Sequence, residues 1–188
     1  MGTKLCSEKL FINANQLSGP NNTKFSVVRY GNVIASRGSV IPYFKELSEN
    51  SNNKIPLTHN EMTRFFITLD SAVNFVFRSL SNMTSGEIFI PKMNSIFIKD
   101  LIKILCPKNA VKIIGVRAGE KIHETLFSSQ ESNNILEKKD CYVILPYKTN
   151  YRDKKNFKTI KNFVYSSDLK KNINLKKIEK LIKLKKFF

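Results

Sequence analysis

The chain has 188 residues, 41% of them hydrophobic, which is enough to pack the interior of one compact unit and excludes wholesale disorder. Because it contains no run of about 18 apolar residues and no secretory signal pattern, we expect a cytoplasmic location and no membrane partner. The formal net charge of +17 gathers mostly after residue 150, and Lys, Asn and Ile are all frequent, as an AT-rich coding sequence would produce. We therefore expect no nucleic-acid partner.

A basic module built on residues 151–188 remains the alternative from another functional class. Such a module would bind nucleic acid or an anionic surface, and its binding would weaken steeply with salt. The segment lacks aromatic residues interleaved regularly with its lysines, which disfavours this alternative.

The first half of the chain alternates helical and extended patterns. Apolar residues at helical spacing predict a first helix, and a short β-branched run predicts a buried strand of a parallel sheet. The elements expected in chain order are a helix at Thr3–Leu17, a strand at Phe25–Tyr30, a helix at Ser39–Leu47, a polar loop at Asn50–Lys54 and a helix at Thr68–Met83. The last of these carries an apolar face formed by Ala72, Val73, Val76, Phe77 and Leu80.

The second half continues the alternation, so the fold class is α/β. The expected strands are Glu87–Pro91, Ser95–Ile98, Val111–Val116 and Cys141–Leu145, and the expected helices are Lys99–Cys106, Gly119–Phe127 and the amphipathic stretch Leu175–Leu184. We divide the chain into residues 1–146, which carry the fold, and a Lys-rich segment, residues 147–188.

The three cysteines, Cys6, Cys106 and Cys141, are odd in number and show no CxxC spacing. Neither a disulfide framework nor a metal site is therefore expected, and we interpret all three as buried thiols.

The segment 28–42 concentrates polar and small residues at the exit of a predicted strand, where open α/β sheets bind ligands. Asn32 offers an acceptor and two donors on a short stem, which suits a sugar hydroxyl or a phosphate, while Gly31 and Gly38 permit close backbone approach. The alternative is an ordinary turn between a strand and a helix.

Two further segments carry arginines that suit an anion. Arg64 lies among large apolar residues and must find an anion or a carboxylate if it is buried. Arg117 follows a predicted strand and opens the predicted helix at Gly119–Phe127, so that its fork and free N–H groups match phosphate oxygens. Glu120 could accept from the hydroxyls of a ribose, although a surface salt bridge explains Arg117 and Glu120 as well.

Taken in order, these segments resemble the extended short-chain dehydrogenase/reductase family, most closely its inverting UDP-N-acetylglucosamine 4,6-dehydratases. The motifs that carry the resemblance are GTKLCSEKLF (2–11), RYGNVIASRGSVIP (29–42), MTRFFITLD (62–70), GEIFIPK (86–92), RAGEKIHE (117–124) and NFVYSSD (162–168). The resemblance implies the C-terminal part of a Rossmann-type fold with a smaller substrate-binding subdomain.

The resemblance also implies roles for particular residues. Lys4 would be the lysine of a YxxxK pair, holding the nicotinamide ribose and acting in catalysis, and Asn32 would touch the substrate. Arg64 and Arg117 would clamp the pyrophosphate of a UDP-sugar, and Glu120 would hold the uridine ribose. The residues that would border the nicotinamide end of NADP are Val33, Ile34, Ala35, Ser36 and Arg37. The implied product is a 4-keto-6-deoxy sugar nucleotide for surface polysaccharide or pseudaminic acid synthesis.

The sequence departs from the family at its front. The YxxxK spacing puts the tyrosine one residue before Met1, and no GxGxxG loop is present, so by resemblance about 140 residues of the cofactor half would precede this chain. We expect residues 1–188 alone to be inactive, with an uncovered sheet edge at Phe25–Tyr30 and uncovered apolar helix faces, and the full-length form to be a homo-oligomer. His59 and His123 match no position that the family uses for chemistry.

A UDP-sugar 4-epimerase of the same family is the nearest alternative, because it shares the Arg-Tyr-x-Asn and Arg-x-Gly-acid elements. The Arg37-Gly38-Ser39 run and the segment MTRFFIT favour the dehydratase.

Overall fold

The computed structural model describes residues 2–17, 23–146, 158–160 and 162–184. The chain forms two compact units. Unit 1 comprises Met1–Tyr30, Val73–Lys92 and Leu126–Tyr165, and unit 2 comprises Gly31–Ala72, Met93–Thr125 and Ser166–Phe188. The division proposed at residue 146 stays a prediction, since residues 147–157 lie outside the described part.

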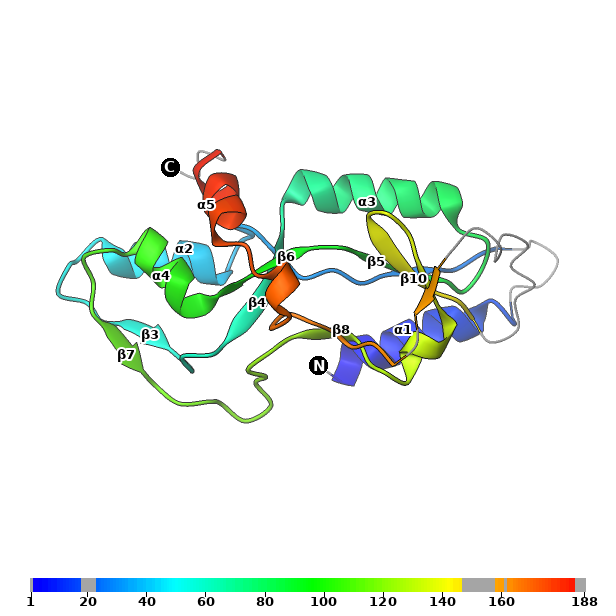
Figure 1. The fold of residues 1–188 in the computed structure, drawn as a ribbon, viewed down its shortest axis with the longest axis horizontal. Helices are drawn as coiled ribbons and strands as arrows, with labels where there is room; N and C mark the ends of the chain where they lie inside the picture. Colours follow the sequence, from blue (N-terminus) through cyan, green and yellow to red (C-terminus); the bar gives the residue numbers. More distant parts are fainter. Residues whose placement is uncertain (1, 18–22, 147–157, 161, 185–188) are drawn as a thin grey trace. The chain divides into compact units, whose positions relative to one another are not determined.

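Unit 1 is built on a five-stranded sheet with the order β1-β5-β10-β9-β11 (Figure 1). Its elements are α1 (Gly2–Ala14), β1 (Val27–Val28), β5 (Ile88–Pro91), η1 (Glu131–Asn134), β9 (Ile135–Glu137), β10 (Cys141–Ile144) and β11 (Lys158–Ile160). β1 pairs in parallel with β5, and the remaining pairs are antiparallel. β1 ends one side of this sheet among the described strands, as expected, but it is only two residues long and half-buried rather than a fully buried strand.

Helix α3 (Leu69–Asn82) confirms the helix expected at Thr68–Met83, and the Thr68 side chain caps its start. The Thr68 hydroxyl accepts a hydrogen bond from the Ser71 N–H at 3.1 Å, which satisfies one free donor of the first turn. Its buried stripe, however, runs through Ala72, Phe75 and Ser79. Of the apolar face predicted from the sequence only Ala72 is buried, and the exposed members are Val73, Val76, Phe77 and Leu80.

A buried ion cluster around Arg29 joins three segments of unit 1. Its guanidinium binds the Glu8 carboxylate of α1 through two hydrogen bonds of 2.7 and 2.6 Å. It also donates to the Glu131 carboxylate at 2.7 Å and to the Leu126 carbonyl at 2.7 Å. Burial opposes the charge of Arg29, but Glu8 and Glu131 outweigh it and raise the pKa of the guanidinium. Arg29 therefore fixes α1 and the start of η1 to the end of β1.

We expect this cluster to set the acid limit of stability. Burial would raise the pKa of Glu131, but hydrogen bonds from Arg29 and from the Ser128 N–H lower it below the ordinary value. Glu131 thus stabilises the fold above the unfolded glutamate pKa of about 4.3, and this contribution is lost as the pH falls through the lower folded value. Urea unfolding of Glu131→Gln between pH 7 and pH 3 should therefore show a shallower acid limb than wild type. The exposed Glu46→Gln, the matched control, should keep the wild-type slope, and equal slopes for all three proteins would contradict the expectation.

Unit 2 contains two small sheets and three helices around one apolar core. Strands β2 (Asn32–Val33), β4 (Thr63–Ile67) and β6 (Asn94–Phe97) form one sheet, with β2 parallel and β6 antiparallel to β4. β3 (Ile55–Leu57) pairs in parallel with β7 (Val111–Ile113). The helices are α2 (Val40–Ser48), α4 (Ile98–Leu105) and α5 (Leu175–Leu184), and η3 spans Lys170–Asn172.

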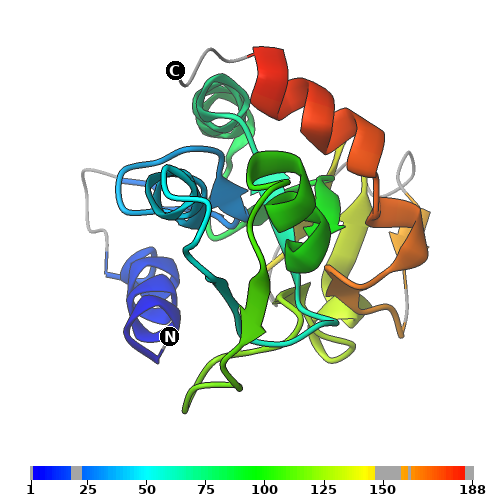
Figure 2. The same cartoon turned by 90° about the vertical axis from the view of Figure 1, so that its left-hand side faces the viewer.

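The core of unit 2 combines residues from α2, β6 and α4 with residues from α5 near the end of the chain. α2 and α4 pack against each other, which Figure 2 shows from the side. Ile178 and Ile182 of α5 are buried in the same cluster as Phe44, Ile96 and Leu101. Because α5 uses its apolar face inside unit 2, its lysines Lys176, Lys177 and Lys180 are left exposed on the opposite side. In the described segments no helix is long and apolar enough to cross a membrane.

Most predicted elements are confirmed within one or two residues at each end. The remaining observed strands are β8 (Thr125–Phe127) and β12 (Tyr165–Ser166). Two further predictions are wrong. The helix expected at Gly119–Phe127 is absent, because the carbonyls of Lys121 and Ile122 accept from Arg64 instead. Cys6 is exposed on α1 rather than buried.

The three thiols should differ in reactivity. Burial raises the pKa of Cys106, and burial together with Asp140 raises the pKa of Cys141 to about 11. Since the thiolate is the reactive form, iodoacetamide at pH 8 should modify only Cys6 in the folded chain and all three cysteines in urea. Intact-mass and peptide mass spectrometry measure this directly, and rapid native labelling of Cys141 would contradict the burial described here.

Candidate functional site

Strand β4 places Thr63 and Arg64 at the start of the central strand of a three-stranded sheet in unit 2. Thr63, Phe65 and Ile67 alternate with Arg64 and Phe66 along the strand, so Thr63 and Arg64 point to opposite faces. Gly31 precedes β2 and lies against Phe65, where an added Cβ would come within 2.5 Å of the Phe65 Cβ. The predicted close approach at Gly31 is therefore made to the protein's own strand.

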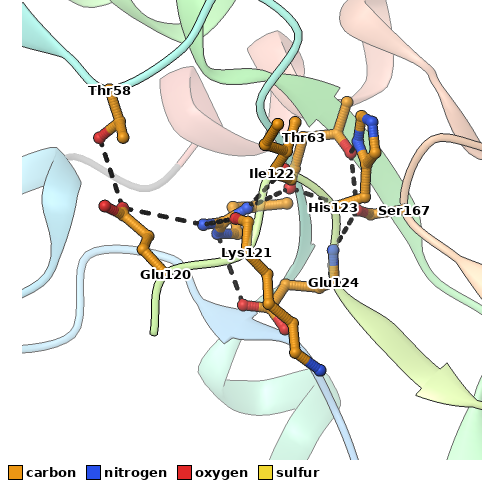
Figure 3. Close-up of polar contacts among 9 residues, drawn as sticks. Thr58, Thr63, Glu120, Lys121, Ile122, His123, Glu124 and Ser167 are labelled. Atoms are coloured by element: carbon orange, nitrogen blue, oxygen red, sulfur yellow. Dashed lines mark hydrogen bonds and ion pairs between the residues drawn. The ribbon is translucent and has the colours of Figure 1, made fainter. Parts of the chain in front are cut away.

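Arg64 is the centre of a polar cluster. Figure 3 labels its partners at residues 63, 120, 121, 122 and 124. Its side chain is only 12% exposed. Nη1 donates to the carbonyls of Thr63 at 2.7 Å and Ile122 at 2.9 Å, and Nη2 donates to the carbonyl of Lys121 at 2.7 Å. Arg64 has thus found the partners that a buried guanidinium needs, and most of them are main-chain oxygens.

Two carboxylates complete the surroundings of Arg64. Nε lies 3.6 Å from Glu124 Oε1, and Nη2 lies 4.0 Å from Glu120 Oε1. Burial lowers the pKa of Arg64, and the two carboxylates oppose this shift. Two carboxylates and three carbonyls thus surround one guanidinium, so the positive charge of Arg64 is fully compensated within the protein.

Residues 121–124 are irregular, with a bend at Ile122 and His123, which corrects the predicted helix at Gly119–Phe127. The carbonyls of Lys121 and Ile122, which would bond inside a helix, accept from Arg64, and the Ile122 carbonyl also accepts from the Thr63 N–H at 3.0 Å. Gly119 has φ +77°, a left-handed conformation that stops a helix. Long-range partners therefore replace the local hydrogen bonds, and Arg117 does not stand at a helix start.

A second group of contacts holds the other side of this segment. The hydroxyls of Thr63 and Ser167 lie 2.7 Å apart, and Thr63 Oγ1 lies 2.8 Å from Nδ1 of His123. The Glu124 N–H donates to Ser167 Oγ at 2.9 Å, and the Ser167 N–H donates to the Glu124 carbonyl at 2.9 Å. Figure 3 shows these side chains converging on the 121–124 segment from separate parts of unit 2.

Arg117 and Glu120 form a tight turn immediately before that segment. The Glu120 N–H donates to the Arg117 carbonyl at 3.0 Å, and the Glu120 carboxylate accepts from the Arg117 N–H at 3.4 Å. Thr58 of unit 2 donates its hydroxyl to the same carboxylate at 3.3 Å. The Arg117 residue itself is exposed, so it is open to an anion in solution.

The segment predicted to border the cofactor leaves β2 as an irregular turn. Ser36 and Arg37 are exposed, and Ala35 has φ +55°, an unusual conformation for a residue with a Cβ. Ile34 is 3% exposed, with its side chain in the core of unit 2, and its N–H donates to the Ile67 carbonyl at 2.9 Å. Any contact of Ile34 with a ligand would therefore have to use its main-chain oxygen.

The site residues expected from the sequence fall into both units. Asn32 and Val33 form β2, and Arg64, Arg117 and Glu120 belong to the same unit 2. Lys4 lies exposed on α1 of unit 1, one turn before Glu8. Of these residues the structure brings Arg64, Glu120 and Arg117 into one connected set.

Sequence reasoning missed Thr63, Glu124 and Ser167. Each is a common polar residue without a distinctive spacing, and their contacts span 43 to 104 residues of chain. Their one signal was their place inside three of the motifs, MTRFFITLD, RAGEKIHE and NFVYSSD. In the part of the chain that is described, no group of three or more His, Cys, Asp or Glu side chains could hold a metal ion.

Helices and sheets together make the chain an α/β protein, and Arg117 is exposed in unit 2. Residues 1–146 match the family described as "Polysaccharide biosynthesis protein", so the chain belongs to this family. In Campylobacter jejuni (strain 81-176), UDP-N-acetylglucosamine 4,6-dehydratase (inverting) is 49% identical over 144 residues, which are 77% of this chain and 43% of that protein. The resemblance to this group of short-chain dehydrogenases is thus confirmed.

Other relatives carry a different name or cover more of the chain. A Rickettsia conorii protein named UDP-glucose 4-epimerase is 34% identical over 190 residues, which are 96% of this chain and 55% of that protein. The X-ray structure of Pen from Bacillus thuringiensis superimposes with a TM-score of 0.85 at 32% identity, covering 98% of this chain and 56% of that one. The α/β class is therefore confirmed, and the chain spans about half the length of the proteins it matches.

Replacing Arg64 should unfold the 121–124 segment first. Arg64→Met keeps the length of the side chain but removes three hydrogen bonds to carbonyls and the cation beside two acids, which should lower the free energy of unfolding by about 3 kcal/mol. Arg64→Lys keeps the charge but not the fork, so it should recover part of that loss. Urea unfolding measures both values, and hydrogen exchange should show the largest increase at residues 121–124. A loss below about 0.5 kcal/mol for Arg64→Met would show that the cluster does not hold the segment.

Proposed function

We propose that this chain is the substrate-binding part of an NADP-dependent UDP-N-acetylglucosamine 4,6-dehydratase. The observation that carries the proposal is the Arg117–Glu120 turn, in which Arg117 is exposed and its backbone N–H donates to the Glu120 carboxylate, in a chain that shares 49% identity with a dehydratase of that name. A guanidinium fork suits the pyrophosphate of a UDP-sugar, and a carboxylate suits the hydroxyls of its ribose.

Each proposed binding residue has a chemical task. Arg117 would bind the pyrophosphate, and Glu120 would accept from the ribose hydroxyls. Asn32, exposed at the end of β2, would hydrogen-bond the sugar. Arg64 would add positive charge to the pyrophosphate side, although its donors already bind the carbonyls of residues 63, 121 and 122. These four residues lie in unit 2, so substrate binding would be a property of that unit.

The residues proposed for the cofactor fit an anionic dinucleotide in part. Arg37 and Ser36 are exposed in a turn that contains the left-handed residues Ala35 and Gly38, so cationic and hydroxyl groups are accessible there. Lys4 would donate to the nicotinamide ribose and lower the pKa of the base tyrosine of the YxxxK pair. When bound, NADP would take up hydride from C4 of the sugar and return it to C6 after water is lost across C5 and C6. The product would be a 4-keto-6-deoxy sugar nucleotide for a surface polysaccharide or pseudaminic acid.

A UDP-sugar 4-epimerase is the second candidate, favoured by the Rickettsia relatives of that name. Both reactions begin on a UDP-sugar, so they share the same binding residues. Product analysis on a protein that includes the cofactor half separates them, because only dehydration removes the C6 hydroxyl.

UDP binding tests the part of the proposal that these residues can perform alone. Isothermal titration calorimetry of the 188-residue chain should detect UDP, and Arg117→Ala should raise the Kd about tenfold because a charged hydrogen bond is lost. Lys121→Ala is the matched control, since it removes the same charge from an exposed neighbour. A chain that does not bind UDP at millimolar concentration, or equal effects of the two variants, would overturn the proposal.

A further inference from the structure

Four consecutive residues of unit 2, Lys121 to Glu124, are each held by a partner far away in the sequence. Arg64 binds the carbonyls of the first two, and the Thr63 hydroxyl contacts the ring of His123. Ser167 binds both main-chain groups of Glu124. Its hydroxyl accepts from the Glu124 N–H, and its own N–H donates to the Glu124 carbonyl, each at 2.9 Å. The main chain is therefore held at Lys121, Ile122 and Glu124, and His123 is held through its ring.

The hydroxyls of Thr63 and Ser167 form the buried centre of this support. Both residues are 0% exposed, and they lie 104 positions apart in the chain. A buried hydroxyl without a partner is unfavourable, and here each hydroxyl has at least two. Neither side chain reaches the surface, so neither can touch a ligand.

The contacts of residues 121–124 also hold the exposed turn that precedes them. Arg117, Ala118 and Gly119 are exposed, and Gly119 is in the left-handed conformation. The contacts of Glu120 join the turn to Thr58 and Arg64, and residue 121 begins the fixed segment. A shift of residues 121–124 would therefore displace Glu120 and Arg117 together.

We infer that Thr63 and Ser167 are positioning residues for nucleotide binding: their paired hydroxyls fix residues 121–124 and thereby hold the turn that carries Arg117 and Glu120. The inference rests on the proposed function of the turn. It assigns a role to the C-terminal motif NFVYSSD, which then serves the site through Ser167 without contacting the ligand.

The first test compares two buried serines. Ser167→Ala removes the hydroxyl behind the turn. Ser132→Ala removes an equally buried hydroxyl of unit 1, which donates to the Ser129 carbonyl at 2.6 Å and accepts from the Phe163 N–H at 3.4 Å. Calorimetry with UDP on the full 188-residue chain should give a Kd about tenfold higher for Ser167→Ala and an unchanged Kd for Ser132→Ala.

The second test uses rescue by a conservative change. Thr63→Val keeps the shape but removes the hydroxyl, so it should weaken UDP binding as Ser167→Ala does. Thr63→Ser keeps the hydroxyl and should restore most of the affinity. If Ser167→Ala does not fold, Thr63→Val and Thr63→Ser still test the inference, because serine keeps the hydroxyl at position 63 and valine does not.

Three outcomes are distinguishable. Selective loss of affinity in Ser167→Ala and Thr63→Val supports the inference. Wild-type chain that binds UDP while Ser167→Ala matches Ser132→Ala, or Thr63→Val matches Thr63→Ser, overturns the inference and leaves the proposed function intact. Wild-type chain that does not bind UDP overturns the proposed function, and the inference with it.

Discussion

The buried guanidinium of Arg64 constrains the surrounding backbone more than any other group in unit 2. A cation that is 12% exposed is tolerated only when its donors are satisfied, and three of its hydrogen bonds go to carbonyls rather than to side chains. A carbonyl inside a helix is already paired, so residues 121 and 122 must stay outside a helix to accept from Arg64. The conformation of the segment is therefore a consequence of the charge that it covers.

The sequence predicted those elements whose patterns are local. Thr68 supplies a side-chain cap for α3, and the alternation along Ser95–Ile98 reappears as β6 one residue earlier, so spacing and capping suffice there. The helix expected at Gly119–Phe127 failed because its apolar spacing said nothing about Arg64, whose carbonyl partners are 57 and 58 residues away. Tertiary hydrogen bonds then outweighed local propensity.

The candidate site was predictable only as far as motifs reach. Arg64, Arg117 and Glu120 stand out because charged residues beside apolar ones demand partners, and the structure connects them. Ser167 could not be found in this way, since a serine near the end of the chain is unremarkable until folding buries it beside Thr63. Helix α3 shows the same limit for packing, because a helix with apolar residues on two sides does not reveal that Phe75 and Ser79 are the buried ones.

The hydroxyl pair can keep its hydrogen bonds whichever way the ring of His123 is protonated. When Nδ1 is an acceptor, Ser167 donates to Thr63 Oγ1 and Thr63 donates to the ring. When Nδ1 carries a proton, the ring donates to Thr63 and Thr63 donates to Ser167. Ser167 then turns its own proton to the Thr63 carbonyl at 3.2 Å. In both arrangements the Glu124 N–H still finds an acceptor on Ser167 Oγ. Two hydroxyls between a histidine and a backbone amide thus keep their hydrogen bonds in either tautomer of the ring, so the 121–124 segment and the turn before it stay in place.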